Sequence, residues 1–326
     1  MKDFKIAQPQ TMEQVTSLFA EKREGYYLMA GGTDILDEIK SGTVEPEVVV
    51  DLKSIPNLSY IRKEKDGVHI GTMTTVAELV EDSIIKSDYA ALHQAALSLA
   101  TPQLRNVGTV GGNLCQRPRC WYYRDPEVFC VKKGGTKCFA FKGRNKYHAI
   151  FGGGVCYIVY PSDLAPALIA LDAEISISSP KKDKAVPLQD FYVLPQVNAR
   201  KENILEPGEV VREIKIPLVK SGEKSAYLKL KERGTWDFAL VSAAVKANIS
   251  GGVFNDIKII LGGVAPIPWR LEKAENLIKG NKVSEEMLRA AAREALKEAR
   301  PLEENGYKVE LAEAAVYRAA LSLLQE

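Results

Sequence analysis

The chain has 326 residues, of which 46% are hydrophobic and 26% are charged, which is an ordinary balance for a globular protein. This length exceeds one typical hydrophobic core and predicts two domains, or three small ones. The net charge of +2 gives no strong field toward nucleic acid or acidic membranes, and no apolar run reaches the ~18 residues of a membrane-spanning helix. Because the start, MKDFKIAQPQ, lacks the apolar core of a signal peptide, we expect a cytoplasmic protein, with export alongside a signal-bearing partner left open.

The first hundred residues alternate between helix and strand patterns. Capping-box patterns at Thr11 and Thr75 each predict the start of a helix. The expected helices cover 11–24, 35–40, a short segment from 75, and 88–99, and the expected strands cover 26–30, 48–52, 60–63 and 68–71. This alternation is typical of an α/β domain.

Two glycine-rich turns interrupt this pattern. The first, Ala30 to Asp34, follows a strand and precedes a helix, where glycines let backbone N–H groups approach a phosphate; a plain tight turn is the alternative. The second, Arg105 to Asn113, places hydroxyl and amide side chains among its glycines. Two such turns suit opposite faces of a diphosphate-bearing dinucleotide. The GxGxxG fingerprint is absent, so a nicotinamide-type fold is not supported.

All five cysteines fall within 42 positions, which in a reducing compartment is more typical of metal or redox sites than of disulfides. Their positions are Cys115, Cys120, Cys130, Cys138 and Cys156. The last four are separated by 9, 7 and 17 residues, which is too irregular for a zinc ribbon with paired CxxC knuckles. A [4Fe–4S] cluster, a zinc site and plain buried cysteines all remain open. The flanking basic residues would offset cluster charge and lower thiol pKa values: Arg117, Arg119, Arg124, Lys132 and Lys133.

The rest of the first domain contains a helix at 164–171 and strands at 173–178 and 210–217. Asp163, in Pro161-Ser-Asp163, either caps that helix or faces a ligand. A linker over 219–224 places a domain boundary at 218/219, so that the domains cover 1–218 and 219–326. The second domain is expected to contain strands at 227–231, 239–249 and 256–261 and helices at 284–299 and 308–324. No catalytic triad, HExxH motif or carboxylate pair is visible, so no catalytic residue is assigned.

Five motifs in this order resemble one known family. They are LMAGGTDIL from Leu28, RNVGTVGGNL from Arg105, PSD from Pro161, Tyr227-x-Lys229-x3-Arg233-x3-Asp237-x-Ala239, and LGGVAPIPWR from Leu261. Together they resemble the FAD-binding medium subunit of molybdenum hydroxylases such as xanthine dehydrogenase and carbon monoxide dehydrogenase. The resemblance covers essentially the whole chain.

The resemblance implies an α+β fold: a two-lobed FAD-binding domain of the vanillyl-alcohol-oxidase (PCMH) type, followed by a C-terminal domain like that of the CO dehydrogenase flavoprotein. It also implies FAD contacts at Met29, Ala30, Gly31, Gly32, Thr33, Asp34, Ile35, Leu36, Thr109, Gly111, Gly112, Asn113, Asp163, Val211 and Lys229. For Val211 the alternative is a core strand residue, and for Lys229 it is a solvated strand lysine.

The cysteine segment, an insertion at about 115–156, is similar to that in the flavin subunits of 4-hydroxybenzoyl-CoA reductase and periplasmic aldehyde oxidoreductases. There it carries a [4Fe–4S] cluster, which implies that Cys120, Cys130, Cys138 and Cys156 are ligands and that Cys115 is not. The implied function is an electron-transfer subunit that works with a molybdopterin-binding large subunit and a [2Fe–2S] small subunit. The alternatives are a stand-alone FAD-dependent oxidoreductase and a zinc-stabilised binding module.

Overall fold

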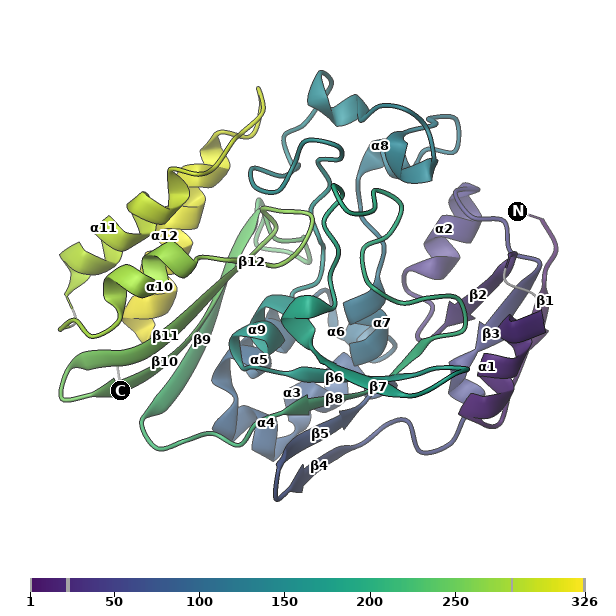
Figure 1. Ribbon diagram of the computed structural model, residues 1–326, viewed down its shortest axis with the longest axis horizontal. Coiled ribbons are helices and arrows are strands. Elements are labelled where there is room, and N and C mark those ends of the chain that lie inside the picture. The colour runs from purple at the N-terminus through teal and green to yellow at the C-terminus, as the bar shows by residue number, and fades with distance from the viewer. Residues whose placement is uncertain (1, 22–23, 283, 325–326) are drawn as a thin grey trace.

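The computed structural model describes residues 2–21, 24–282 and 284–324. The N-terminal lobe is a three-stranded parallel sheet in the order β1-β3-β2, formed by β1 (Lys5–Ala7), β2 (Tyr26–Met29) and β3 (Val48–Asp51). Helices α1 (Met12–Glu21) and α2 (Ile35–Ser41) connect these strands (Figure 1). A small core that includes Val15, Phe19 and Val50 holds the lobe together.

The second lobe is built on an antiparallel sheet in the order β4-β5-β8-β6-β7. Its strands are β4 (Ile61–Glu64), β5 (Gly67–Gly71), β6 (Glu174–Ser178), β7 (Lys184–Pro187) and β8 (Val210–Ile216). Its helices are α3 (Val76–Glu81), α4 (Ser83–Asp88), α5 (Ala90–Ser98), α6 (Pro102–Arg105), α7 (Val110–Cys115) and α9 (Leu164–Ala170). Every residue of α9 is buried, because this helix lies in the largest core.

The C-terminal part is an antiparallel sheet in the order β12-β11-β10-β9. Its strands are β9 (Glu223–Leu230), β10 (Val241–Ser250), β11 (Val253–Gly262) and β12 (Trp269–Arg270), and its helices are α10 (Glu272–Ile278), α11 (Glu285–Leu296) and α12 (Tyr307–Ser322). The three C-terminal helices cover the outer face, while α5 and α9 lie between this sheet and the five-stranded one (Figure 1). Consequently β10 is buried on both faces along most of its length.

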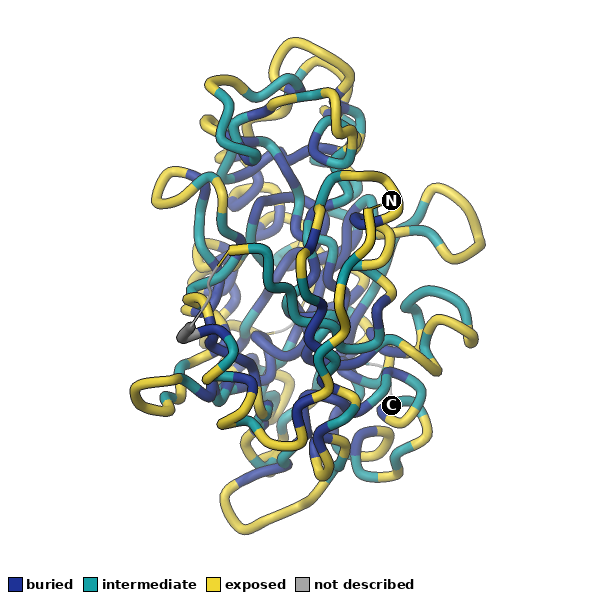
Figure 2. The backbone as a smooth tube through the Cα atoms, turned by 90° about the vertical axis from the view of Figure 1, so that its right-hand side faces the viewer, coloured by how far each residue is buried: buried dark blue, intermediate teal, exposed yellow. Residues whose placement is uncertain are grey.

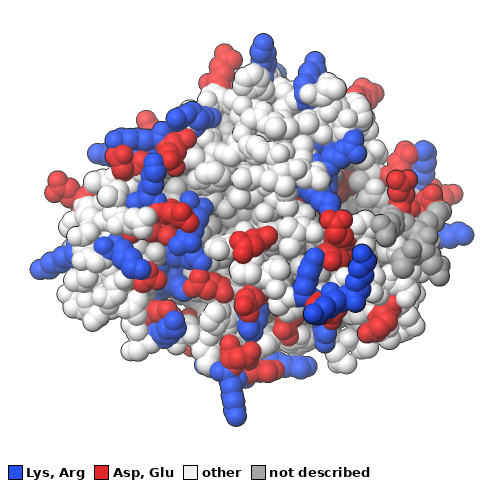
Figure 3. All heavy atoms as spheres, in the orientation of Figure 1, with Lys and Arg blue, Asp and Glu red and all other residues white. Residues whose placement is uncertain are grey.

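The cysteine segment lies above the junction of the lobes in Figure 1 and contains no β-strand among its described residues. Its only α-helix is α8 (Trp121–Arg124). Along the whole chain, exposed residues concentrate in loops at the periphery (Figure 2), and both signs of charge are mixed over the face shown in Figure 3. No helix in the described part of the chain combines the length and hydrophobicity needed to cross a membrane.

Several sequence-based predictions differ from the structure. Alternation in the first hundred residues suggested an α/β domain, and the sheet of β1, β2 and β3 is parallel, but β4 and β5 belong to an antiparallel sheet. The expected linker over 219–224 ends early because β9 begins at Glu223. No helix was predicted within the second glycine turn, yet α7 begins inside it at Val110. Helix α10 was missed, and the predicted end of the first helix at Glu24 depends on residues 22–23, which lie outside the described residues.

Candidate cofactor sites

The two glycine turns lie directly against each other. A Cβ atom added to Gly31 would lie 2.0 Å from the carbonyl oxygen of Val107, which belongs to the second turn. One added to Gly111 would lie 1.9 Å from the hydroxyl oxygen of Thr72, and one on Gly112 would contact Ala30 at 3.5 Å. Only glycine permits this approach at the first two positions, so the backbones of both turns share one small region.

Backbone donors are available at this contact. Within the described residues, the N–H groups of Gly31, Gly32 and Thr33 donate no hydrogen bond to the chain. In the second turn, the Thr109 hydroxyl accepts from the Gly112 N–H at 3.1 Å and starts α7. Clustered free N–H groups at a glycine turn suit an anionic group such as a diphosphate.

Two cavities flank the glycine turns. The first cavity, of about 550 Å³, extends from the turns past Tyr27 and Lys133 to Val211. The second, of about 260 Å³, extends the other way, past Leu99 to Trp236. We call them the adenosine-side and the ring-side cavity, after the halves of FAD that are proposed for them below. Five residues line both cavities: Thr33, Asp34, Thr109, Gly112 and Gln116. The two spaces therefore meet at the turns, as an elongated ligand with a central diphosphate requires.

Most of the residues expected to contact FAD line one of these cavities. The adenosine-side cavity takes Ala30, Gly31, Gly32, Thr33, Asp34, Ile35, Thr109, Gly111, Gly112 and Val211, and the ring-side cavity adds Asn113, Asp163 and Lys229. Met29 and Leu36 line neither of these two cavities. Val211 is 4% exposed and also belongs to the main core. It therefore lines the cavity, as an FAD contact would, and also packs as a core strand residue.

Asp163 and Lys229 form a buried ion pair. Lys229 Nζ lies 2.7 Å from one carboxylate oxygen of Asp163, and the Tyr227 hydroxyl donates to the other at 2.7 Å. The side chains of Lys229 and Asp163 are 2% and 6% exposed. Hence Lys229 is not a solvated strand lysine. Asp163 is not a helix cap either, because the Ser162 hydroxyl accepts from the Ala165 N–H instead.

Most of the basic residues that were expected to offset cluster charge and to lower thiol pKa values pair with carboxylates. Arg119 and Arg124 contact Asp34 at 2.9 and 2.6 Å. Arg117 and Lys132 both contact the buried Glu202. Lys133 donates to the Asp125 carbonyl group, and only Lys132 helps to lower a thiol pKa, that of Cys156. The Asp34 carboxylate thus fastens the cysteine segment to the first glycine turn.

Four cysteines are brought close together. The neighbouring Cys156 thiol lowers the pKa of Cys138 to about 6, aided by the N–H groups of Tyr157, Ala140 and Phe141, and the Cys138 thiol in turn raises the pKa of Cys156. Burial raises the pKa of Cys120 to about 11, with Cys138 and Cys130 as further causes. Cys115 lies apart on α7, and burial alone raises its pKa to about 12.

The spacing of these sulfurs is wider than a zinc site needs. Four sulfurs at about 2.3 Å from one zinc ion would lie roughly 3.8 Å from one another. Among the described residues, the only trio of such ligand atoms within 4.8 Å of one another is Glu64, Asp66 and His69, in the β4–β5 hairpin, and it includes no cysteine. No three of these sulfurs therefore lie as close together as the ligands of one zinc ion.

Residues from the C-terminal end hold the cysteine segment from the other side. Glu304 accepts from the N–H groups of Asn145 and Lys146, and Asn305 donates to the carbonyl groups of His148 and Ala149. Lys308, which is fully buried, donates to the carbonyl groups of Tyr147 and Gly263. Burial lowers the pKa of Lys308 to about 7. His148 in turn contacts the Cys120 sulfur at 3.2 Å.

Sequence reasoning missed several residues of the ring-side cavity. Trp236 and Phe238 flank Asp237 in the Tyr-x-Lys motif, and both side chains are largely exposed. Ala100 also lines this cavity and has a left-handed φ of 48°, which is rare for a residue with a side chain. The aromatic pair inside a recognised motif was the one available signal.

Comparison with known proteins gives two family matches that follow each other along the chain. Residues 2–219 match the FAD binding domain in molybdopterin dehydrogenase, and residues 225–323 match the CO dehydrogenase flavoprotein C-terminal domain. The aldehyde oxidoreductase FAD-binding subunit PaoB of Escherichia coli K12 is 34% identical over 91% of both chains. The carbon monoxide dehydrogenase medium chain of Hydrogenophaga pseudoflava is 28% identical over 92% of this chain and 88% of its own.

A solved structure agrees with these matches. Carbon monoxide dehydrogenase from Hydrogenophaga pseudoflava superposes with a TM-score of 0.79 at 28% identity, covering 99% of this chain and 98% of that one. The fold is therefore that of an FAD-binding domain followed by a flavoprotein C-terminal domain. The chain belongs to the family of FAD-binding medium subunits of molybdenum hydroxylases, and it is an oxidoreductase flavoprotein subunit.

Proposed function

We propose that this subunit carries FAD along the two glycine turns and a [4Fe–4S] cluster in the cysteine segment, and passes electrons between them. The observation that carries the FAD part is the contact of Gly31 with Val107, which leaves unpaired N–H groups between two connected cavities. FAD, when bound, supplies the exchange between two-electron and one-electron transfer.

The chain's own residues hold and orient this cofactor. Gly31, Gly32 and Thr33 would donate backbone hydrogen bonds to the diphosphate, and Val211 would line the adenosine side. On the ring side, Asn113 and the Asp163–Lys229 pair would present polar atoms from a rigid frame, because Asn113 accepts from Ser162 and Asp163 is fixed from two directions. Met29 and Leu36 line neither cavity, and they would contribute to FAD binding by setting the backbone shape of the first glycine turn.

The cluster proposal is supported by Cys120, Cys130, Cys138 and Cys156. They gather on a segment without strands, no three of their sulfurs lie within 4.8 Å of one another, and hydrogen bonds from backbone N–H groups lower the pKa of the Cys138 thiol. Such hydrogen bonds are a recognised means of tuning iron–sulfur clusters. Within the family, a cluster in this segment would make the chain similar to the flavin subunits of 4-hydroxybenzoyl-CoA reductase and periplasmic aldehyde oxidoreductases.

We further propose that the partners are a molybdopterin-binding large subunit and a [2Fe–2S] small subunit, in the cytoplasm. Multi-subunit relatives and clustered free thiols support these assignments. The domain boundary at 218/219 also remains a proposal. It is supported by the two family matches, which end and begin at residues 219 and 225.

Metal and flavin analysis of anaerobically purified protein tests these assignments. We expect one FAD and about four irons per chain, without zinc. Cys130→Ser should remove iron and leave FAD, whereas Cys115→Ser should retain both. FAD without iron would reduce the cysteine segment to a structural loop, and zinc without FAD would contradict both assignments.

A further inference from the structure

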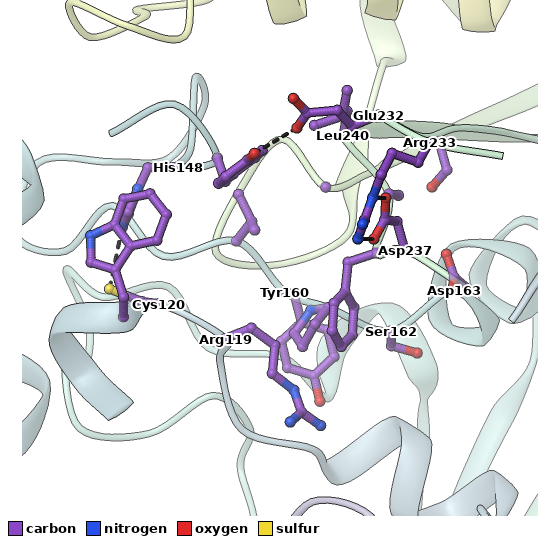
Figure 4. Close-up of a pocket in the computed structure, with 18 residues that line it drawn as sticks. Arg119, Cys120, His148, Tyr160, Ser162, Asp163, Glu232, Arg233, Asp237 and Leu240 are labelled. Atoms are coloured by element: carbon purple, nitrogen blue, oxygen red, sulfur yellow. Dashed lines mark hydrogen bonds and ion pairs between the residues drawn. The ribbon is translucent and has the colours of Figure 1, made fainter. Parts of the chain in front are cut away.

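His148 lies against one of the four proposed cluster ligands. Its Nε2 atom is 3.2 Å from the Cys120 sulfur (both side chains are labelled in Figure 4), and the residue is 3% exposed. The rings of Trp121 and Tyr122 pack against the imidazole, with centroid distances of 5.2 and 6.2 Å. The imidazole is therefore held beside the sulfur by its neighbours on the cysteine segment.

The backbone of His148 is also fixed, and the C-terminal domain supplies part of its support. The N–H group of His148 donates to the Asn145 carbonyl group at 2.9 Å, and its own carbonyl group accepts from the Asn305 side chain at 3.1 Å. Asn305 is fully buried and lies shortly before α12. The position of the imidazole thus depends on contacts between the two domains, and not on the cysteine segment alone.

The chemistry of the two ring nitrogens determines which of them carries the proton. Within the described residues, His148 Nδ1 is buried and has no hydrogen-bond partner. A cysteine that binds metal is a thiolate, and its sulfur can only accept hydrogen bonds. With the proton on Nδ1, neither ring nitrogen would have a partner, whereas a proton on Nε2 is donated to the Cys120 sulfur. Because unpaired buried polar atoms cost free energy, the second arrangement is favoured.

Cys120 is the proposed ligand that lies nearest to the ring-side cavity along the chain. The residue before it, Arg119, lines that cavity. Arg119, Cys120 and His148 also line an adjoining cavity of about 500 Å³, whereas Cys130 and Cys138 line neither of the two spaces. The imidazole therefore acts on a ligand on the side of the cluster that faces the proposed flavin.

We propose that His148 is a positioning residue for electron transfer, whose Nε2–H group donates to the Cys120 thiolate and raises the reduction potential of the cluster bound there. Reduction adds one electron and no proton to the cluster, and the flavin is the partner that supplies or receives this electron. The thiolate sulfurs share the added negative charge, so a donor to sulfur stabilises the reduced form more than the oxidised form. Asn305 contributes by holding the His148 backbone. This proposal rests on the cluster proposed above.

The test is an anaerobic titration of the full chain with dithionite, in which electron paramagnetic resonance follows the midpoint potential of the cluster. His148→Phe should weaken the reduced form relative to the oxidised form about two- to tenfold, as expected for one lost hydrogen bond, which is a shift of about 20–60 mV to lower potential. His148→Gln should keep most of the potential, because its amide N–H group can reach the same sulfur. His93→Phe, which removes an imidazole bonded to the Val80 carbonyl group, should leave the potential unchanged.

A second measurement needs no loss of the imidazole. The chain has three histidines, and His69 and His93 lie on β5 and α5, outside the cysteine segment. In the chain labelled with ¹⁵N-histidine, pulsed electron paramagnetic resonance of the reduced cluster should detect one weakly coupled histidine nitrogen, which His148→Gln should remove. This measurement decides the question even where His148→Phe fails to bind iron.

Three results would overturn the proposal: an unchanged potential in His148→Phe with iron retained, equal shifts in His148→Phe and His148→Gln, or no histidine nitrogen coupled to the cluster. Equal shifts would show that the imidazole only fills space. Failure of the cluster assignment is distinguishable, since iron analysis of the unaltered chain would then find no iron before any variant is made.

Discussion

Replacing Lys229 with methionine should destabilise the protein strongly. Lys229 and Asp163 lie 2.7 Å apart and are 2% and 6% exposed, so removing the cation leaves a buried carboxylate with only the Tyr227 hydroxyl as a partner. Breaking a buried pair in this way typically lowers the free energy of unfolding by about 3–5 kcal/mol. We expect Lys229→Met to fall in this range.

The surface pair of Lys215 and Glu174 provides a matched control. Its charged atoms are also 2.7 Å apart, but the two side chains are 29% and 44% exposed. Exposed pairs contribute about 0–1 kcal/mol because water and salt screen them. Lys215→Met should therefore change the free energy of unfolding by no more than about 1 kcal/mol.

Urea unfolding of the FAD-free protein, followed by tryptophan fluorescence, measures both effects without a contribution from ligand binding. The double variant Lys229→Met/Asp163→Leu should recover part of the loss, because no unpaired charge then remains buried. If Lys229→Met and Lys215→Met have equal effects, burial does not control the strength of this ion pair and the reasoning is refuted.

Two further predictions concern the glycine turns and the buried lysine. Gly31→Ala should weaken FAD binding at least about tenfold in a fluorescence titration, because the new Cβ displaces the Val107 carbonyl group. Gly234→Ala, which has open space around it, should leave the affinity unchanged. Equal affinities of the two variants would contradict the proposed FAD site at the glycine turns. The free energy of unfolding should rise between pH 7 and 9, by up to about 1.4 kcal/mol per pH unit, because Lys308 has a pKa of about 7 when folded and keeps its proton when unfolded. Lys308→Met should flatten this slope in urea titrations at each pH, and an unchanged slope would show that Lys308 is not its source.

Local patterns predicted much of the fold. The capping box at Thr75 forms with both of its reciprocal hydrogen bonds, and the strand-turn-helix reading around Gly31 and Gly32 holds because β2 ends at Met29 and α2 begins at Ile35. These features depend on residues within a few positions of one another. Sheet order does not, and the partnership of β5 with β8 joins segments more than a hundred residues apart.

The candidate sites show the same division. The glycine turns and cysteines could be named from their sequence, but their neighbours could not. Asp34 was expected at the cofactor, yet its carboxylate contacts three groups of the cysteine segment, because arginines distant in sequence fold back onto it. The cavity of about 500 Å³ that is lined by Arg119, Tyr160 and Ser242 joins residues from five separate segments, and no spacing in the sequence indicates that they meet.

The hydrogen bonds that Glu304, Asn305 and Lys308 make with residues 145–149 have a consequence for biosynthesis. Lys308 follows Cys156 by 152 residues, so a ribosome working at about 5–20 residues per second needs on the order of 10–30 s between them. Until then the cysteine segment lacks the backbone partners that shape one of its sides. The thiols of a nascent chain would therefore be exposed before the cysteine segment has taken its final shape. Any metal cluster would be inserted only when translation is nearly complete.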